Sequence, residues 1–296
     1  MDIAGLVKGA AEGQGLGNQF LAHIRETDAI LQVVRFFDDP NIPHVEEQVE
    51  PYKDIEIVNL ELILADSEQV RKRRDKLVRD IHTGVKEAII EEAILAKLEQ
   101  GFAAGKLALH AGLTSEEQKR ITHLNLLTMK PMLYALNKKS GGHNLDELAD
   151  GRAERAYALV KKLGARYIMV DAATEQALND VADEDRMSFR EELGALDDGL
   201  AGLIREAYKT LDLISFFTTG ADETRAWTIP RGSTAPAAGA AIHTDFKDKF
   251  IRAEVIPTNA LLAAGSFAAA REKGLVRIEG KNYIVQDGDV IVFLHG

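Results

Sequence analysis

The chain has 296 residues, of which 46% are hydrophobic and 28% charged, as is usual for a globular protein of two or three domains. It has no cysteine, which excludes disulfides and thiolate metal sites and fits a cytoplasmic protein. Its net charge of −11 disfavours a protein that coats nucleic acid indiscriminately, and no apolar run approaches the ~18 residues of a membrane span. We therefore expect neither DNA nor a membrane among its partners.

Residues 1–64 indicate the beginning of an α/β domain. Glycines recur in residues 5–18, which is typical of a loop, and apolar residues at helical spacing follow in residues 20–25. Residues 29–37 form a short and nearly continuous apolar run, as in a strand that is buried on both faces. A helix is then expected at residues 54–64.

Residues 65–124 predict an antiparallel helical hairpin inserted into that domain. Charged residues separate apolar residues that recur at intervals of three, four and seven, namely Val70, Leu77, Ile81, Val85, Ile89 and Leu98. We expect the second arm to run to about residues 121–124. Within it, Thr114 and Glu117 have the spacing of a capping box, which begins a helix.

Residues 125–212 continue the α/β domain. Two more strand-like runs, at 131–136 and 165–170, flank a helix that is expected at 145–163. Strand, helix and strand in alternation are typical of a parallel sheet. The predicted fold class is therefore α/β, with the hairpin inserted between strands of one sheet.

Residues 213–296 predict a separate, small β-rich domain. Short β-type runs occur at 226–229, 251–255, 276–278, 283–285 and 290–294. This segment carries nine basic and nine acidic residues, so the whole net charge of −11 lies in residues 1–212. Trp227, the only tryptophan, is expected in the core of this domain rather than as a platform for stacked bases.

Asp2-Ile3-Ala4-Gly5 has the form D-x-x-G. In GTPase-type sites such an Asp holds the Mg²⁺ of the nucleotide, usually through water, and the Gly amide meets the γ-phosphate because glycine lets the backbone approach closely. The pattern alone is weak, since any Asp-loop-Gly fits it. Asp2 and Gly5 are therefore candidates for metal and nucleotide binding, with an ordinary loop as the alternative.

Two further candidate sites stand at the ends of predicted strands. Asn137 and Lys138 follow the strand at 131–136, and Asp171 and Ala172 follow the strand at 165–170. Open α/β sheets bind ligands at this edge, where an Asn-Lys pair can contact a purine and a backbone group can contact the same base. A turn or a helix cap is the alternative role for Asn137.

The basic run Arg71, Lys72, Arg73 and Arg74 lies on the predicted hairpin. Residues 70–130 hold twelve basic and eight acidic residues, so RNA phosphates are better matched there than elsewhere in residues 1–212. A solvated helix face explains the same four charges equally well. The adjacent residues His243, Thr244 and Asp245 do not predict a catalytic relay, since neighbours on a strand point to opposite faces.

Several sequence blocks resemble the YchF/Obg-like ATPase family. Those similar to its switch II region are residues 2–7, 13–21 and 24–30. Those similar to its C-terminal TGS domain are residues 216–220, 223–229, 241–246, 250–255 and 280–289. The resemblance implies a P-loop nucleotide hydrolase with a coiled-coil insertion and a β-grasp-like TGS domain. It also implies ATP binding, often in preference to GTP, hydrolysis with Mg²⁺, and association with ribosomes.

The chain departs from this family at two points. It contains no G-x-x-x-x-G-K-[ST], so residues 1–64 are expected to be an N-terminally truncated nucleotide-binding domain. We therefore expect the chain alone to be inactive, and to use Mg²⁺ with ATP or GTP only if a P-loop is supplied. Ser140 stands where the family motif Asn-x-x-Glu has Glu, so the preference for ATP or GTP is left open.

Three interpretations follow. The leading one is a YchF-type, ribosome-associated nucleotide hydrolase whose chain lacks the P-loop. The second is a non-catalytic module that binds the ribosome, its rRNA or a protein through the hairpin and the TGS domain. The third is a fragment of a longer gene product. In each, the strand at 29–37 is expected to present an unpaired apolar edge through which copies of the chain associate.

Overall fold

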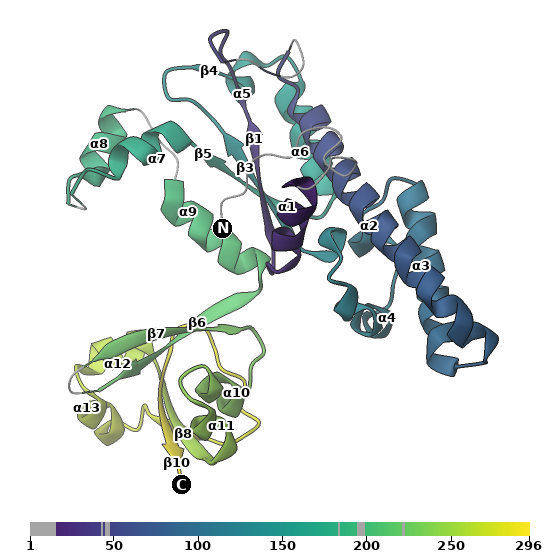
Figure 1. Ribbon diagram of the computed structural model, residues 1–296. Helices are drawn as coiled ribbons and strands as arrows, with labels where there is room; N and C mark the ends of the chain where they lie inside the picture. Colours follow the sequence, from purple (N-terminus) through teal and green to yellow (C-terminus); the bar gives the residue numbers. More distant parts are fainter. Residues whose placement is uncertain (1–15, 43, 45–47, 183, 194–198, 221–222) are drawn as a thin grey trace. The chain divides into compact units, whose positions relative to one another are not determined.

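The computed structural model describes residues 16–296 apart from 43, 45–47, 183, 194–198 and 221–222 (Figure 1). The chain divides into two compact units, Met1–Ala207 and Tyr208–Gly296. The finer division predicted at residues 64, 124 and 212 stays a prediction.

A three-stranded parallel sheet lies at the centre of the first unit, and it confirms the predicted α/β class. Its strands are β1 (Ile30–Arg35), β3 (Met132–Asn137) and β5 (Arg166–Val170), in the order β1-β3-β5. Residues 132–136 of β3 are all buried, since this strand has a neighbour on either side. A short antiparallel pair, β2 (Phe37–Asp38) and β4 (His143–Asn144), lies beyond the carboxyl ends of β1 and β3.

Helix α1 (Leu16–Arg25) precedes β1, and α2 (Pro51–His82) follows β2 as one continuous helix of 32 residues. The helix predicted at 54–64 lies within α2, which continues without a break into the first arm of the hairpin. Pro51 begins α2 where its missing N–H is not needed, and no glycine or proline follows before Gly84. Figure 1 shows α2 running from beside the sheet into the hairpin.

Helix α3 (Lys86–Ala103) returns along α2 and completes the hairpin. The predicted second arm is too long, because the helix ends before Gly105, whose φ of 68° is left-handed. Short helical turns follow, namely η1 (Ala108–His110), α4 (Ser115–Arg120), η2 (Thr122–Leu124) and η3 (Leu127–Met129). The predicted capping box is confirmed: Glu117 N donates to Thr114 Oγ1 at 3.2 Å, and Thr114 N donates to Glu117 Oε2 at 2.8 Å.

Buried apolar side chains hold the two arms of the hairpin together. They include Val70 and Leu77 on α2, and Ala88, Ile94, Leu95 and Leu98 on α3. Val85 and Ile89 are 43% and 49% exposed, so the prediction that they continue this row is wrong. Gly84, with a left-handed φ of 77°, lies in the turn that resets the helical register between the arms.

The helix predicted at 145–163 is interrupted. α5 (Leu145–Leu148) and α6 (Arg152–Lys162) are separated by Ala149 and Gly151, whose φ angles of 50° and 86° cannot continue a right-handed helix. After β5 come α7 (Ala172–Leu178), α8 (Arg186–Glu192) and α9 (Gly199–Thr210). Within the described residues, no helix has the length and apolar character that crossing a membrane requires.

The second unit is built on a five-stranded sheet with the strand order β7-β6-β10-β8-β9. Its strands are β6 (Leu213–Thr219), β7 (Thr224–Pro230), β8 (Phe250–Pro257), β9 (Arg277–Glu279) and β10 (Asp289–His295). Its helices are α10 (Ala235–Ala240), α11 (Thr244–Asp248), α12 (Thr258–Ala264) and α13 (Phe267–Glu272). β6 was not among the predicted strands, and the strand predicted at 283–285 makes only an isolated bridge between Ile284 and Thr234.

Tyr283 and Asp289 form a polar contact at the beginning of β10. Asp289 is 2% exposed, and its Oδ2 accepts hydrogen bonds from Tyr283 Oη at 2.7 Å and Gln286 N at 2.9 Å. Burial, followed by the adjacent Asp289 carboxylate, raises the pKa of Tyr283 from 10 to about 12. The hydrogen bond to Asp289 therefore requires the protonated tyrosine.

We expect the second unit to lose stability as the pH rises from 10 through about 12, because Tyr283 deprotonates more readily in the unfolded chain than in the folded one. Tyr283→Phe should cost about 1–2 kcal/mol at neutral pH and remove this alkaline dependence. Thermal unfolding over this pH range checks both effects. Tyr208→Phe, which changes an exposed hydroxyl of the same unit, is the matched control. An unchanged alkaline transition in Tyr283→Phe would contradict the assignment.

Candidate nucleotide and RNA sites

The carboxyl ends of β3 and β5 bring two predicted site segments together. Asn137 ends β3, and Ala172 begins α7 directly after β5. The backbone N–H of Ala172 donates to Asn137 Oδ1 at 3.0 Å. Because β3 and β5 are adjacent parallel strands, both residues lie at the edge where open α/β sheets bind ligands.

Asp171 fixes the loop after β3 to the beginning of α7. Its side chain is nearly inaccessible and accepts hydrogen bonds from Ser140 N at 2.7 Å, from Ala173 N and Thr174 N at 3.1 Å, and from Thr174 Oγ1 at 2.9 Å. Burial alone would raise the pKa of Asp171, but these hydrogen bonds from Ser140 and Thr174 outweigh it and hold the pKa below its ordinary value. The carboxylate therefore caps α7 and holds the loop that contains Ser140.

Lys138 is held against α5. Its Nζ lies 2.9 Å from Asp146 Oδ2 and 3.2 Å from Glu147 Oε1. Burial opposes the charged form, but the two carboxylates outweigh burial and raise the pKa of Lys138. The ammonium group is therefore engaged beside the strand ends, and its position is set by α5.

The rest of this loop is fixed by side chains of two other segments. Lys139 N donates to Asn144 Oδ1 at 2.9 Å, and Lys139 Nζ contacts Asp39, which follows β2. The hydrogen bond from Lys139 lowers the pKa of Asp39. Ser140 Oγ lies 3.4 Å from Thr174 Oγ1. The conformation of residues 138–140, at the carboxyl edge of the sheet, is thus fixed by contacts with neighbouring segments.

Asp2 and Gly5, the residues expected to meet Mg²⁺ and the γ-phosphate, lie outside the described residues. Over the part of the chain that is described, no three His, Asp or Glu side chains gather in a way that would hold a metal ion. The assignments of Asp2 and Gly5 therefore remain predictions.

The predicted basic run divides between two sides of α2. Arg73 Nε and Nη2 donate to Glu91 at 2.7 and 2.8 Å, and Arg74 Nε donates to Glu92 at 2.9 Å. These pairs join α2 to α3, so Arg73 and Arg74 serve the hairpin itself. Arg71 and Lys72 point outward because successive helical residues differ by about 100°.

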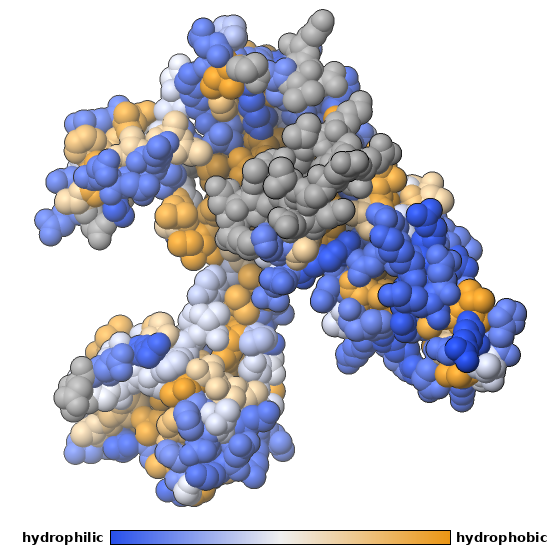
Figure 2. All heavy atoms as spheres, viewed as in Figure 1, coloured by the Kyte–Doolittle hydropathy of each residue, from blue (hydrophilic) through white to orange (hydrophobic). Residues whose placement is uncertain are grey.

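The outward side of α2 carries further cations that the sequence analysis missed. Lys76 and Arg79 are exposed and follow Lys72 by four and seven residues, which places all three on one face of the helix. Lys72 is paired with Glu68 at 2.7 Å across one helical turn. Hydrophilic residues cover most of the visible face of the hairpin (Figure 2). Their spacing of four and three residues in the sequence could have predicted that these cations share one face of a helix.

In the second unit, the residues weighed from the sequence have structural roles. Trp227 packs at the edge of the core, its Nε1 donates to Thr218 Oγ1 at 2.9 Å, and the Arg225 guanidinium lies 4.3 Å from its ring centre. The prediction that His243 lies on a strand is wrong. This residue caps α11 by accepting a hydrogen bond from Asp245 N at 3.2 Å.

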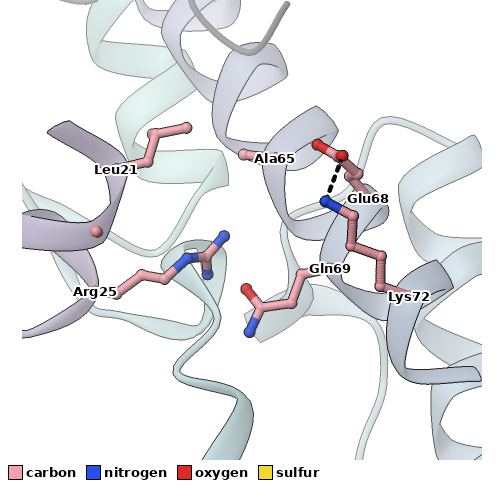
Figure 3. Close-up of a pocket in the computed structure, with 7 residues that line it drawn as sticks. Leu21, Arg25, Ala65, Glu68, Gln69 and Lys72 are labelled. Atoms are coloured by element: carbon pink, nitrogen blue, oxygen red, sulfur yellow. Dashed lines mark ion pairs between the residues drawn. The ribbon is translucent and has the colours of Figure 1, made fainter. Parts of the chain in front are cut away.

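Two cavities lie near the base of the hairpin. One, of about 240 Å³, is a groove between α1 and α2 (Figure 3). It is lined by Leu21, Ala22, Arg25, Ala65, Glu68, Gln69 and Lys72. The other, of about 410 Å³, lies between residues 27–28 and the loops of residues 115–131. Arg25 and Gln69 face one another across the first groove.

Comparison with known proteins places the chain in one family. Residues 213–295 match the family model YchF-GTPase_C, which is described as a protein of unknown function (DUF933). The ribosome-binding ATPase YchF of Bacillus subtilis is 46% identical, over 99% of this chain and 80% of the relative. The ribosome-binding ATPase YchF of Escherichia coli O157:H7 is 44% identical over the same shares.

A solved structure gives the same result. The Schizosaccharomyces pombe YchF GTPase is 33% identical and superposes with a TM-score of 0.82, covering 97% of this chain and 78% of that one. With this level of identity over nearly its whole length, the chain belongs to the YchF family.

Proposed function

We propose that this chain is a cytoplasmic, ribosome-associated protein that binds ATP or GTP through its first unit and hydrolyses it with Mg²⁺ when a phosphate-binding loop is present. The observation that carries this is the 46% identity to a ribosome-binding ATPase over 99% of the chain. The contact between Asn137 and Ala172 at the carboxyl edge of the sheet supports a nucleotide site there.

The purine base is assigned to Asn137, Lys138, Asp171 and Ala172. Asn137 Oδ1 is occupied by Ala172 N, and its Nδ2 makes no hydrogen bond to another described residue. That amide is therefore a donor for the purine N7, which adenine and guanine share. Ser140 both donates and accepts, so it suits the amino group of adenine and the carbonyl of guanine equally. Weak discrimination between ATP and GTP follows.

A carboxylate at position 140 should create a preference for guanine, because it accepts hydrogen bonds from the N–H groups of that base. We expect Ser140→Asp to shift the ratio of the Mg-GTP and Mg-ATP dissociation constants about tenfold toward GTP, measured by calorimetric titration. Ser140→Ala, which leaves the backbone bond to Asp171 intact, is the control and should leave the ratio unchanged. An unchanged ratio in Ser140→Asp, with both nucleotides bound, would remove Ser140 from the base site.

The phosphate end of the nucleotide is assigned to Asp2 and Gly5. Asp2 would hold Mg²⁺ through water, and the ion would neutralise charge on the transferred phosphoryl group. A second candidate function, favoured by the exposed cations of α2, is a non-catalytic module that binds ribosomes or proteins. A titration of the unmodified chain with Mg-ATP distinguishes the nucleotide hydrolase from the non-catalytic module. Micromolar affinity excludes the module, and no binding at millimolar nucleotide excludes the hydrolase for this chain.

Ribosome contact is assigned to the outward cations of α2, Arg71, Lys72, Lys76 and Arg79, with rRNA phosphates as the ligand. Arg73 and Arg74 are excluded from this surface because their guanidinium groups bind glutamates of α3. Exposed lysines and arginines that neutralise phosphates release counterions, so the contact should weaken as salt increases.

We expect Arg71→Glu combined with Lys76→Glu to weaken ribosome binding about tenfold or more and to reduce its salt dependence, measured by co-sedimentation at several salt concentrations. Lys161→Glu with Lys162→Glu, on exposed positions of α6, is the matched control for charge. Both variants leave the pairs between α2 and α3 intact. Co-sedimentation that survives the α2 variant at every salt concentration would place the ribosome contact elsewhere.

Self-association is assigned to β1, which is an outer strand of its sheet. Leu31 and Val33 are 45% and 62% exposed, and in the described part of the chain no strand pairs with the outer edge of β1. Such an edge is a template for another strand. We expect sedimentation velocity to show concentration-dependent association of the chain, and Val33→Lys to suppress it. A wild-type chain that stays monomeric at high concentration would refute this association.

A further inference from the structure

The carboxylate of Asp66, in the middle of α2, joins three segments of the first unit. It is 0% exposed and accepts a hydrogen bond from Arg25 Nη1 of α1 at 3.0 Å. It also accepts from Leu127 N at 3.0 Å, Thr128 N at 2.7 Å and Thr128 Oγ1 at 2.8 Å. Loss of a donor to a buried carboxylate is costly in free energy, because the negative charge is then less well compensated.

The same network reaches the end of the second hairpin arm. Thr128 Oγ1, which donates to Asp66, accepts a hydrogen bond from Ala108 N at 3.0 Å. Ala108 begins η1, the turn that follows α3. Nearby, Gln69 Nε2 of α2 donates to Leu124 O. The bases of both arms are therefore tied to residues 124–128 by hydrogen bonds rather than by apolar packing alone.

The C-terminal end of α1 is fastened to this network on two sides. Arg25 Nη1 also donates to Asn125 O at 3.1 Å. Lys130 Nζ donates to Arg25 O at 3.0 Å and contacts Thr27 O, so it caps the end of α1 with a positive charge. Burial lowers the pKa of this lysine. Every one of these contacts lies at the last turn of α1 or just beyond it.

The preceding turn of α1 faces α2 across the 240 Å³ groove of Figure 3. Leu21 and Ala22 line it on the α1 side, and Ala65 and Glu68 line it on the α2 side. Arg25 lies at the end of the groove, where its guanidinium points toward α2. α1 is thus fastened to the hairpin base at its C-terminal end, and Leu21 and Ile24 pack the turn before that end into the core.

We propose that Arg25 and Asp66 form a mechanical link that transmits displacement of α1 to both arms of the hairpin. A shift of the last turn of α1 moves Asp66 through its contact with Arg25. The hydroxyl of Thr128, which contacts both Asp66 and Ala108, carries the shift on to the turn after α3. The link rests on the proposed function only in that residues 2–5, which precede α1, are assigned to the nucleotide. From Leu21 onward, it gives nucleotide binding a route to the proposed ribosome-binding surface through described residues.

The test is made without nucleotide or ribosome, so that failure of the proposed function does not affect it. Leu21→Ala disturbs the packing of α1, where Leu21 is 6% exposed. Amide hydrogen exchange is measured in this variant, in Arg25→Met and in the double variant. We expect Leu21→Ala alone to speed exchange at residues 125–130 and 104–110 by about fivefold or more. In the Arg25→Met background the same change should add less than about twofold there, because coupled sites are not additive.

Two controls keep the result interpretable. Thr128→Val replaces the hydroxyl with a methyl group and so breaks the connection between Asp66 and Ala108. In that background, Leu21→Ala should still speed exchange at residues 125–130 but no longer at residues 104–110. The distal turn at residues 83–85 should not respond in any variant. Equal increments from Leu21→Ala with and without Arg25 would overturn the link. A uniform increase over the whole unit, repeated with the milder Leu21→Val, would overturn it as well, because Leu21 would then act on global stability.

Discussion

The apolar stripe of α2 has to be buried along 32 residues, and no single neighbour of the helix extends that far. The sheet and α6 cover the beginning of the helix, and α3 covers its continuation into the hairpin (Figure 1). One rigid element is thereby shared between the core that carries the strand ends and the arm that carries the exposed cations. Asp66 lies on this helix with Ile55 and Leu62 before it and Val70 and Leu77 after it, so its hydrogen bonds lie between the two regions.

Hydrogen bonds also fix the residues at the carboxyl ends of β3 and β5. Asn137, Ser140 and Asp171 are linked by backbone and side-chain hydrogen bonds before any ligand arrives. Such preorganisation lowers the entropy that binding has to overcome. Asp171 directly follows β5 and is directed inward to this network. Its carboxylate caps α7 and holds the loop, while Ala172 N donates to Asn137 Oδ1.

The three parallel strands of the first unit were predictable because each is a short apolar run bounded by polar residues. The prediction that residues 29–37 are buried on both faces is wrong, since Leu31 and Val33 on one face of β1 are exposed. The short pair β2 and β4 was not predicted. The capping box at Thr114 was predictable because it depends on four consecutive residues only. The start of the hairpin was not, because a helix packed on a sheet and a helix packed on another helix share one apolar period. β6 was missed because its buried residues, Ile214 and Phe216, alternate with positions that are partly apolar themselves, Leu213 and Phe217, so the alternation of burial is not visible in the sequence.

The candidate site shows the same limit. The positions of Asn137 and Ala172 follow from strand order, which local sequence indicates through the alternation of strands and helices. The directions of Arg73 and Arg74 depend on glutamates 18 residues away on α3, which the basic run itself does not reveal. Asp66 gave no signal at all: a single carboxylate among charged helical residues becomes exceptional only when Arg25 and Thr128 are folded against it.

The strand order of the second unit has a consequence for the time at which it can fold. β10 lies between β6 and β8, although it is the last strand of the chain. The middle of the sheet therefore remains open until β10 has been synthesised, and before that only the pairs β6–β7 and β8–β9 can form. Until then, the edges of β6 and β8 with which β10 pairs stay open to strands of other chains. A cut after residue 288 would take away this central strand and leave two separate strand pairs, β6–β7 and β8–β9.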